Sequence, residues 1–255
     1  MSYGGYFAAY YDKLNSECDY EAIADYYQQV FQRFHVQPEL VLDLGCGSGN
    51  ITLPMAQRGY DMIGLDISQE MLQLAMEKAV AAGRQDILFL DQDMTDFELY
   101  GTVDAAICAL DGLNYLTDKR QLMWCLRLTS FYMNPQGLFI FDVNTPYKFE
   151  QVLSGSTFVY DLDEVYCVWQ NRYDKKSRLC EFDITLFAQE GQGWQKYHEC
   201  QQERCYALDE WKTMLERAGF RLEGMYHDRT FRKPGAKSER VYFVARKVTE
   251  AGTWK

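Results

Sequence analysis

Short apolar runs alternate with longer segments of helical periodicity through residues 38–145. The apolar runs are bounded by acids and glycines, which is typical of buried strands. This alternation predicts a parallel sheet with helices on both of its faces. The predicted strands are 41–44, 60–66, 86–91, 103–108 and 137–143. Two predicted helices are 49–59 and a segment through Leu122, Leu126 and Leu128 that stops at Asn134-Pro135.

The C-terminal part of the chain adds two strands to this sheet. Residues 209–218 predict a helix, because acids occupy its first turn and Gly219 follows its end. Apolar segments at 220–226 and 240–246 predict two further strands. The sheet then has seven strands, with a late antiparallel pair.

Residues 146–206 separate the fifth predicted strand from this helix. Apolar and polar residues alternate from Cys180 to Leu186, which is typical of a half-buried antiparallel strand. With outer strands near 158–173 and 194–206, the segment predicts a three-stranded sheet. We expect it to form a lid over the carboxyl ends of the parallel strands, where open α/β sheets bind ligands. The predicted units are an N-terminal helical cover (1–37), a core (38–145 and 207–247) and this antiparallel β lid (146–206).

The most informative segment is Val-Leu-Asp-Leu-Gly-Cys-Gly-Ser-Gly-Asn at 41–50. A strand that carries Asp43 passes directly into a turn in which every second residue is glycine. Such a turn can adopt positive φ angles and expose backbone amides to a ligand at a helix N-terminus. A dinucleotide-binding turn would have its third glycine at position 50, where this chain has Asn50. The acid before the turn also suits a cationic ligand better than a pyrophosphate.

Two further strands are followed by acids. Asp66 ends the second predicted strand, a position from which a carboxylate can accept hydrogen bonds from both hydroxyls of a ribose. Gln92-Asp93-Met94 follows the third strand. Taken alone, neither acid selects a ligand, because acids are common at strand ends.

In this order and spacing, the three segments resemble the motifs of the class I S-adenosylmethionine-dependent methyltransferases. The resemblance covers residues 38–145 and 207–247 and implies a Rossmann-like, mostly parallel seven-stranded sheet. It also implies S-adenosylmethionine as the cofactor and S-adenosylhomocysteine as its product, and Tyr10-Tyr11-Asp12 resembles the aromatic stretch that closes over this cofactor. The residues that the resemblance assigns to cofactor binding are Tyr11, Asp43, Gly45, Cys46, Gly47, Asp66, Ile67, Gln92, Asp93, Met94 and Leu110.

The sequence does not select a catalytic residue. A sulfonium already carries an activated methyl group, so such an enzyme needs mainly to hold the acceptor in line with it in a dry cavity. Side chains at the strand ends and on the lid are candidates to orient the acceptor or to act as a base. They are Asp111, Asn114 and His198, with Asn144 and Tyr147 as further possibilities.

Composition narrows the partners. The chain has 255 residues, with 37 acidic and 26 basic side chains and a formal net charge of −11, which argues against a nucleic acid as the acceptor. The segment 110–116 also lacks the Asn/Asp-Pro-Pro-Tyr signature of nucleobase amino-methyltransferases. A small-molecule acceptor is therefore expected.

Location and metal content also follow from residue usage. No run of 18 apolar residues and no signal peptide is evident, so we expect no membrane association and a cytoplasmic protein. The eight cysteines form no Cys-x-x-Cys pair, and the three histidines lie far apart, so free thiols and no metal site are expected.

Two alternatives stay open at this level. A NAD-linked oxidoreductase would share the ribose-binding acid, although Asn50 and the Gln92-Asp93 segment fit it less well. A non-enzymatic S-adenosylmethionine-binding regulator would keep the glycine turn without an enclosed acceptor pocket. The acceptor, the atom that is methylated and the oligomeric state are not determined by the sequence.

Overall fold

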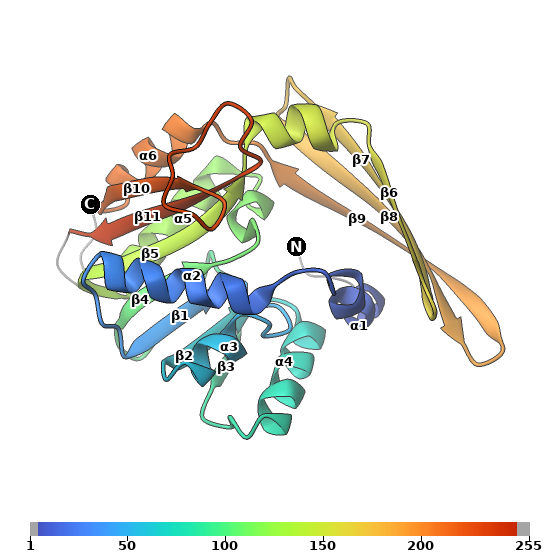
Figure 1. Cartoon of the computed structure of the whole chain (residues 1–255), viewed down its shortest axis with the longest axis horizontal. Coiled ribbons are helices and arrows are strands. Elements are labelled where there is room, and N and C mark those ends of the chain that lie inside the picture. Colours follow the sequence, from blue (N-terminus) through green and yellow to red (C-terminus); the bar gives the residue numbers. More distant parts are fainter. Residues whose placement is uncertain (1–4, 249–255) are drawn as a thin grey trace.

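The computed structural model describes residues 5–248 of the chain (Figure 1). A seven-stranded sheet with the order β10-β11-β5-β4-β1-β2-β3 forms its centre. The strands from β5 to β3 are parallel, whereas β11 pairs antiparallel with both β5 and β10. This confirms the predicted seven-stranded, mostly parallel sheet. The strands are β1 (Leu40–Leu44), β2 (Asp61–Asp66), β3 (Leu88–Asp91), β4 (Val103–Cys108), β5 (Met133–Asn144), β10 (Phe220–His227) and β11 (Arg240–Lys247).

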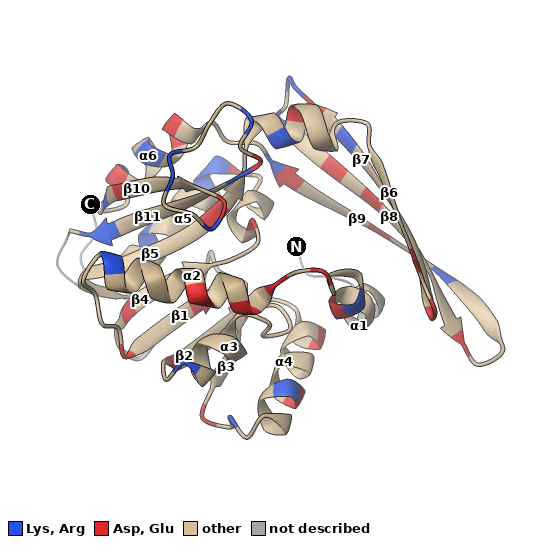
Figure 2. Cartoon of the chain, viewed as in Figure 1, with Lys and Arg blue, Asp and Glu red and all other residues tan. Residues whose placement is uncertain are grey.

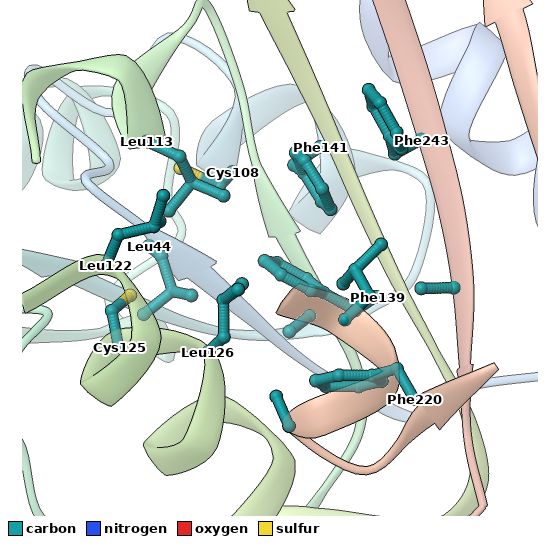
Figure 3. Packing of buried hydrophobic residues seen from close by; sticks show 14 of the residues in the cluster. Leu44, Cys108, Leu113, Leu122, Cys125, Leu126, Phe139, Phe141, Phe220 and Phe243 are labelled. Carbon is teal, nitrogen blue, oxygen red and sulfur yellow. The ribbon is translucent and has the colours of Figure 1, made fainter. Parts of the chain in front are cut away.

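Helices cover both faces of the sheet because its central strands are apolar on both sides. In β5, Phe139 and Phe141 pack toward α5 and α6, in a cluster that also contains Phe220 and Phe243 (Figure 3). The alternate residue, Ile140, packs toward α2 and α3 on the other face. The helices of the core and its flanks are α2 (Tyr20–Arg33), α3 (Thr52–Gln57), α4 (Gln69–Ala81), η1 (Gly112–Tyr115), α5 (Lys119–Phe131) and α6 (Leu208–Arg217).

Two predicted helix boundaries differ from the structure. The helix expected at 49–59 begins only at Thr52, because the residues before it form the glycine turn. The helix expected to stop at Asn134-Pro135 ends at Phe131, and Asn134-Pro135 lies within β5. There the pairing with β4 jumps from Met133 to Leu138, so the proline occupies a bulge and interrupts no ladder hydrogen bond.

The segment between β5 and α6 forms a separate antiparallel sheet of four strands, where three were predicted. The region expected as one outer strand at 158–173 is two strands, because the polar pair Asp163-Glu164 makes a tight turn between them. The order of this sheet is β6-β7-β8-β9, and a π-helix, η2 (Lys148–Leu153), precedes it. The strands are β6 (Thr157–Leu162), β7 (Val165–Asp174), β8 (Leu179–Glu190) and β9 (Gly193–Arg204).

The N-terminal helix α1 (Gly5–Leu14) lies between this second sheet and the core (Figure 1). Phe7 and Leu14 pack into the apolar cluster on the inner face of the sheet, and the Phe7 and Trp169 rings meet edge to face at 6.1 Å. The inner face of this sheet is thus covered by α1 and η2, and it also borders the core through Gln201 of β9. Residues 1–4 of the predicted N-terminal cover lie outside the described residues.

No helix within residues 5–248 is long and apolar enough to cross a membrane.

Candidate active site

A cavity of about 1400 Å³, open mouth included, lies at the carboxyl ends of the parallel strands. Its wall combines the turns after β1, β2, β3 and β4 with side chains from the N-terminal segment and from β9. The structure brings all eleven residues expected to bind the cofactor into this one wall. They are Tyr11, Asp43, Gly45, Cys46, Gly47, Asp66, Ile67, Gln92, Asp93, Met94 and Leu110.

The glycine turn has the left-handed backbone that its sequence predicted. Gly47 has φ +53°, and a Cβ built there would meet no protein atom within 4 Å, because the position faces the cavity. Gly49 has φ +76° and packs against α4, where an added Cβ would lie 3.0 Å from Cβ of Ala75. The turn therefore presents bare backbone to the cavity at Gly47 and lets α4 approach closely at Gly49. This is the surface that a nucleoside cofactor with a methionyl tail needs.

Asp43 lies in β1 just before the turn and is 1% exposed. Its carboxylate accepts a 2.7 Å hydrogen bond from the hydroxyl of Thr52, the first residue of α3. Burial and, to a smaller extent, the charge of Asp66 raise the pKa of Asp43 to about 7, against the effect of that hydrogen bond. A cationic ligand beside Asp43 would favour the ionised carboxylate.

Asp66 ends β2 and is held by backbone amides on both sides. Its Oδ2 accepts from the amide of Gly47 at 2.8 Å, and its Oδ1 accepts from the amide of Ser68 at 2.9 Å. Burial raises the pKa of Asp66, and these two hydrogen bonds oppose that rise. Because a carboxylate offers about four acceptor sites, the fixed group keeps lone pairs for a diol in the cavity.

The third predicted segment also faces the cavity. Asp93 is fixed by Thr95, whose amide and hydroxyl donate to Oδ1 at 2.7 and 2.8 Å. The Gln92 side chain accepts from the amide of Glu98 at 2.8 Å. Met94 lies against the glycine turn, with its Cε 3.1 Å from a Cβ built at Gly45. The segment thus supplies two polar groups and an apolar side chain to one side of the cavity.

None of the three catalytic candidates lines this cavity. Asn114 is buried and structural: it donates to the carbonyl of Arg204 at 2.9 Å and accepts from the amide of Asn144 at 3.1 Å. His198 contacts Asp183 at 3.0 Å with more than half of its side chain exposed. Gln201 faces the cavity, and successive side chains of a strand point to opposite faces. Because His198 and Gln201 are an odd number of positions apart, His198 projects from the opposite face of β9.

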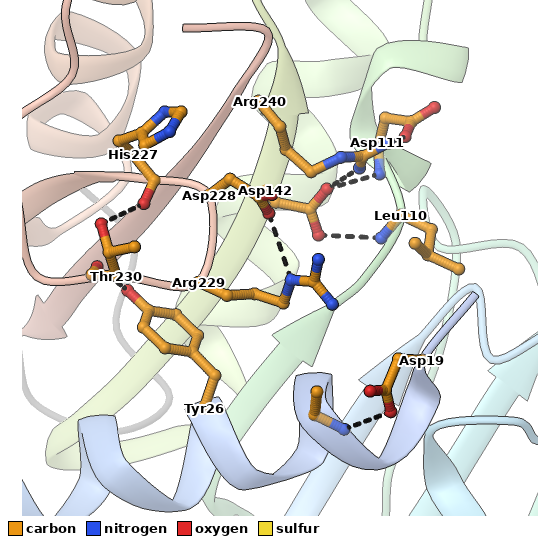
Figure 4. A network of polar contacts seen from close by, with 11 residues as sticks. Asp19, Tyr26, Leu110, Asp111, Asp142, His227, Asp228, Arg229, Thr230 and Arg240 are labelled. Atoms are coloured by element: carbon orange, nitrogen blue, oxygen red, sulfur yellow. Dashed lines mark hydrogen bonds and ion pairs between the residues drawn. The ribbon is translucent and has the colours of Figure 1, made fainter. Parts of the chain in front are cut away.

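The third candidate, Asp111, belongs to a buried ion-pair network behind the cavity wall (Figure 4). Asp142 of β5 accepts from the amides of Leu110 and Asp111 at 2.8 and 3.1 Å, and Arg240 of β11 contacts both carboxylates. Leu110 and Asp111 have φ values of +52° and +56°, which is costly for residues with side chains. The network therefore holds the strained turn after β4 in the shape that puts Leu110 in the wall.

The further possibilities Asn144 and Tyr147 also lie outside the cavity wall. Asn144 donates to Glu203 of β9 at 2.9 Å, and Tyr147 is half-buried where η2 begins.

Glu203 is 2% exposed, and burial, together with the charge of Asp111, raises its pKa well above the usual range. Burial would also raise the pKa of Asp111, but the charge of Arg240 outweighs this and lowers it. Of the two carboxyl groups, Glu203 is thus the one that holds a proton more readily.

This pair predicts a pH dependence of stability. Between the unfolded pKa of Glu203, about 4.3, and its raised native pKa, the native state binds one proton more, so the free energy of unfolding falls as pH rises. Glu203→Gln copies the protonated group and should gain stability over the native protein by up to about 1.4 kcal/mol per pH unit in this window. Urea unfolding at pH 5, 7 and 9 measures the difference, with Glu181→Gln as control. Parallel pH profiles for the native protein and Glu203→Gln would contradict the assignment.

The cavity also contains residues that the sequence reasoning did not select. Tyr20 comes from the start of α2, Tyr115 from η1 and Gln201 from β9, and the Tyr115 hydroxyl donates to Gln201 at 3.2 Å. Tyr115 lies in the segment 110–116 that follows the fourth predicted strand, but no sequence motif marks Gln201. Only the alternation of β9 could have placed it on the inner face, and the register of that strand was unknown.

Within residues 5–248, no group of three or more His, Cys, Asp and Glu side chains is placed to hold a metal ion. All eight cysteines are free.

Comparisons with known proteins agree with the geometry of the cavity. Residues 41–136 match the model of a methyltransferase domain family. The chain is 32% identical to YqeM of Bacillus subtilis, which bears the name of a methyltransferase, over 97% of this chain and 98% of that one. A crystal structure of an S-adenosylmethionine-dependent methyltransferase from Clostridium acetobutylicum superposes with a TM-score of 0.87 at 27% identity, covering 95% of this chain and 98% of that chain.

More distant structures share the fold. CalS10, an amino pentose methyltransferase from Micromonospora echinaspora, has a TM-score of 0.74 at 19% identity over 97% of this chain and 98% of its own. The full-length match to YqeM, the matched domain and the glycine turn with its strand-end acids lead to the same assignment. The chain belongs to the class I S-adenosylmethionine-dependent methyltransferases.

Proposed function

We propose that this protein transfers the methyl group of S-adenosylmethionine to a small-molecule acceptor. The observation that carries the proposal is the composition of the cavity wall. The wall contains the glycine turn and the strand-end residues that the sequence assigns to the cofactor, which we call the cofactor side. It also contains Tyr20, Tyr115 and Gln201, from elements outside the parallel sheet, which we call the acceptor side. A wall of this composition suits a cofactor with an acceptor beside it.

The family motifs imply a role for each residue of the cofactor side. Asp66 would accept hydrogen bonds from the ribose hydroxyls, and Asp93 would accept from the adenine amine, with Met94 against the ring. The amides of the glycine turn and the carboxylate of Asp43 would hold the methionyl part. When bound, this cofactor supplies an activated methyl group.

The acceptor side would orient the nucleophile and exclude water. Tyr11, Tyr20 and Tyr115 combine apolar rings with polar tips, which suits a surface beside a sulfonium and a small acceptor. The net charge of −11 and the acidic residues at the start of α2 disfavour a polyphosphate acceptor (Figure 2). The free cysteines support our proposal that the enzyme works in the cytoplasm.

An acceptor screen tests this proposal. The native protein is incubated with methyl-radiolabelled S-adenosylmethionine and pools of small metabolites, and label transferred to each pool is counted. We expect label in small molecules. Label that enters only RNA or protein acceptors offered in parallel would contradict the proposal.

Asp66 should contribute a large share of cofactor affinity. Asp66→Ala removes an acceptor of charge-assisted hydrogen bonds, so binding of S-adenosylhomocysteine should weaken by about 1.5–3 kcal/mol in calorimetry. Asp91→Ala is the matched control, because Asp91 pairs with Asp66 at the end of the neighbouring strand but is exposed and bonded to Gln69. Equal affinities for the two variants would remove Asp66 from the site.

A further inference from the structure

Asp12 of α1 connects the N-terminal helix to the glycine turn. Its Oδ1 accepts hydrogen bonds of 2.7 Å from the hydroxyl of Ser48 and from the side-chain amide of Asn50. Its Oδ2 forms an ion pair with Lys78 of α4. One carboxylate thus joins three elements: α1, the turn and α4.

Lys78 completes the network from the other side. Its ammonium group donates to the carbonyl and the hydroxyl of Ser48 at 3.0 and 3.1 Å and to the side-chain oxygen of Asn50 at 2.7 Å. The Asn50 amide therefore uses both of its polar ends, one for Asp12 and one for Lys78. Asn50 stands where a dinucleotide-binding turn has its third glycine. A glycine could make neither of these side-chain hydrogen bonds.

The position of Asp12 determines what the network fixes. The preceding residue, Tyr11, lines the cavity, and the other side of α1 packs through Phe7 and Leu14 against the inner face of the second sheet. Beyond Leu14, residues 15–17 form a turn that leads to α2. Polar contacts that centre on Asp12 tie α1 to the cofactor side of the core.

We propose that Asp12, Lys78, Ser48 and Asn50 form a latch that locks α1 across the cofactor cavity, with Asp12 as a positioning residue that holds Tyr11 in the wall. The inference rests on the proposed function, since it assumes that the cavity receives S-adenosylmethionine. The latch is broken when α1 moves aside, so its strength sets how fast a bound cofactor product leaves. Because α1 also packs against the second sheet, opening the latch also makes the acceptor side more mobile.

Dissociation of radiolabelled S-adenosylhomocysteine, chased with unlabelled compound, tests the latch. Asp12→Asn and Lys78→Met should each raise the dissociation rate roughly tenfold, the effect of losing the net free energy of a charge-assisted hydrogen bond. The association rate should not fall, because breaking the latch also raises the fraction of ligand-free protein that is open to the ligand. The double variant should dissociate no faster than the faster single variant, since both substitutions break one latch. Lys78→Arg keeps the cation and should restore slow dissociation.

Controls separate the latch from general destabilisation and from the proposed function. Glu77→Gln changes the neighbouring, exposed residue of α4, which contacts Gln73, and should leave the dissociation rate unchanged. Hydrogen exchange of the ligand-free variants should accelerate in α1 and not in β1 or β4. Native-like dissociation rates in both latch variants, or additive effects in the double variant, would overturn the latch. If the native protein itself fails to bind S-adenosylhomocysteine, the proposed function fails and the latch with it.

Discussion

Gly47→Val should abolish binding of S-adenosylhomocysteine while leaving the protein folded. Valine at φ +53° costs about 1–2 kcal/mol of stability, which a domain of this size tolerates. No protein atom lies within 4 Å of the added Cβ, so the branched side chain projects into the cavity. It would occupy the space in which the ligand approaches the backbone of the turn. Calorimetry should show no detectable heat of binding.

Gly83→Val is the matched control for this variant. Gly83 follows α4 with φ +69°, is exposed, and also has no atom within 4 Å of a built Cβ. It therefore carries similar backbone strain at a distance from the cavity. The control should bind like the native protein, and both variants should show similar falls in melting temperature. If Gly47→Val still binds normally, the cofactor does not lie on this turn.

Replacing the second sheet by a short Gly/Ser linker should leave a folded core that binds S-adenosylhomocysteine and transfers no methyl group. The seven strands of the core pair only with one another. The replacement removes Gln201, which accepts from the Tyr115 hydroxyl, and so opens the cavity wall beside Tyr115. An acceptor would then no longer be oriented or shielded from water. A modest fall in melting temperature is expected, because Phe7 and Leu14 of α1 become exposed.

The structure determines where the replacement should begin and end. Asn144 and Arg204 both hydrogen-bond to Asn114, so the two ends of the insertion meet and a few residues can join them. Tyr206 should be retained, because its ring packs on Trp211 in the core. The replaced range is therefore 146–204.

A variant shortened only at the β8–β9 turn, residues 190–193, is the control for this replacement and should retain activity. A replacement protein that fails to fold or to bind S-adenosylhomocysteine would show that the insertion is structural. Methyl transfer at the native rate by that protein would show that the insertion does not serve the acceptor.

Local sequence was enough to expect the proposed cofactor residues in one cavity, because most of them follow successive parallel strands. Parallel strands end at one edge of a sheet, so acids at the ends of successive strands meet without any knowledge of distant contacts. Asp43, Asp66 and Asp93 reach one cavity for this reason. The strand positions followed equally from apolar runs, because a buried strand needs apolar residues on both faces.

The acceptor side could not be predicted in the same way, because its residues depend on pairings that are distant in sequence. Asp111 was a reasonable candidate until Arg240, 129 positions later, was found beside it. Asn114 is occupied by backbone groups of β5 and β9, and His198 projects from the outer face of β9. A one-residue change of register would have exchanged His198 with its neighbours on the inner face.

The glycine turn, Asp43 and Asp66 are proposed to form a metal-independent S-adenosylmethionine site. Calorimetric titration of the native protein with S-adenosylhomocysteine and, separately, with NAD, both in the presence of EDTA, tests this site. We expect one S-adenosylhomocysteine bound per chain and no binding of NAD. Binding of NAD in preference to S-adenosylhomocysteine, or binding of neither, would contradict it.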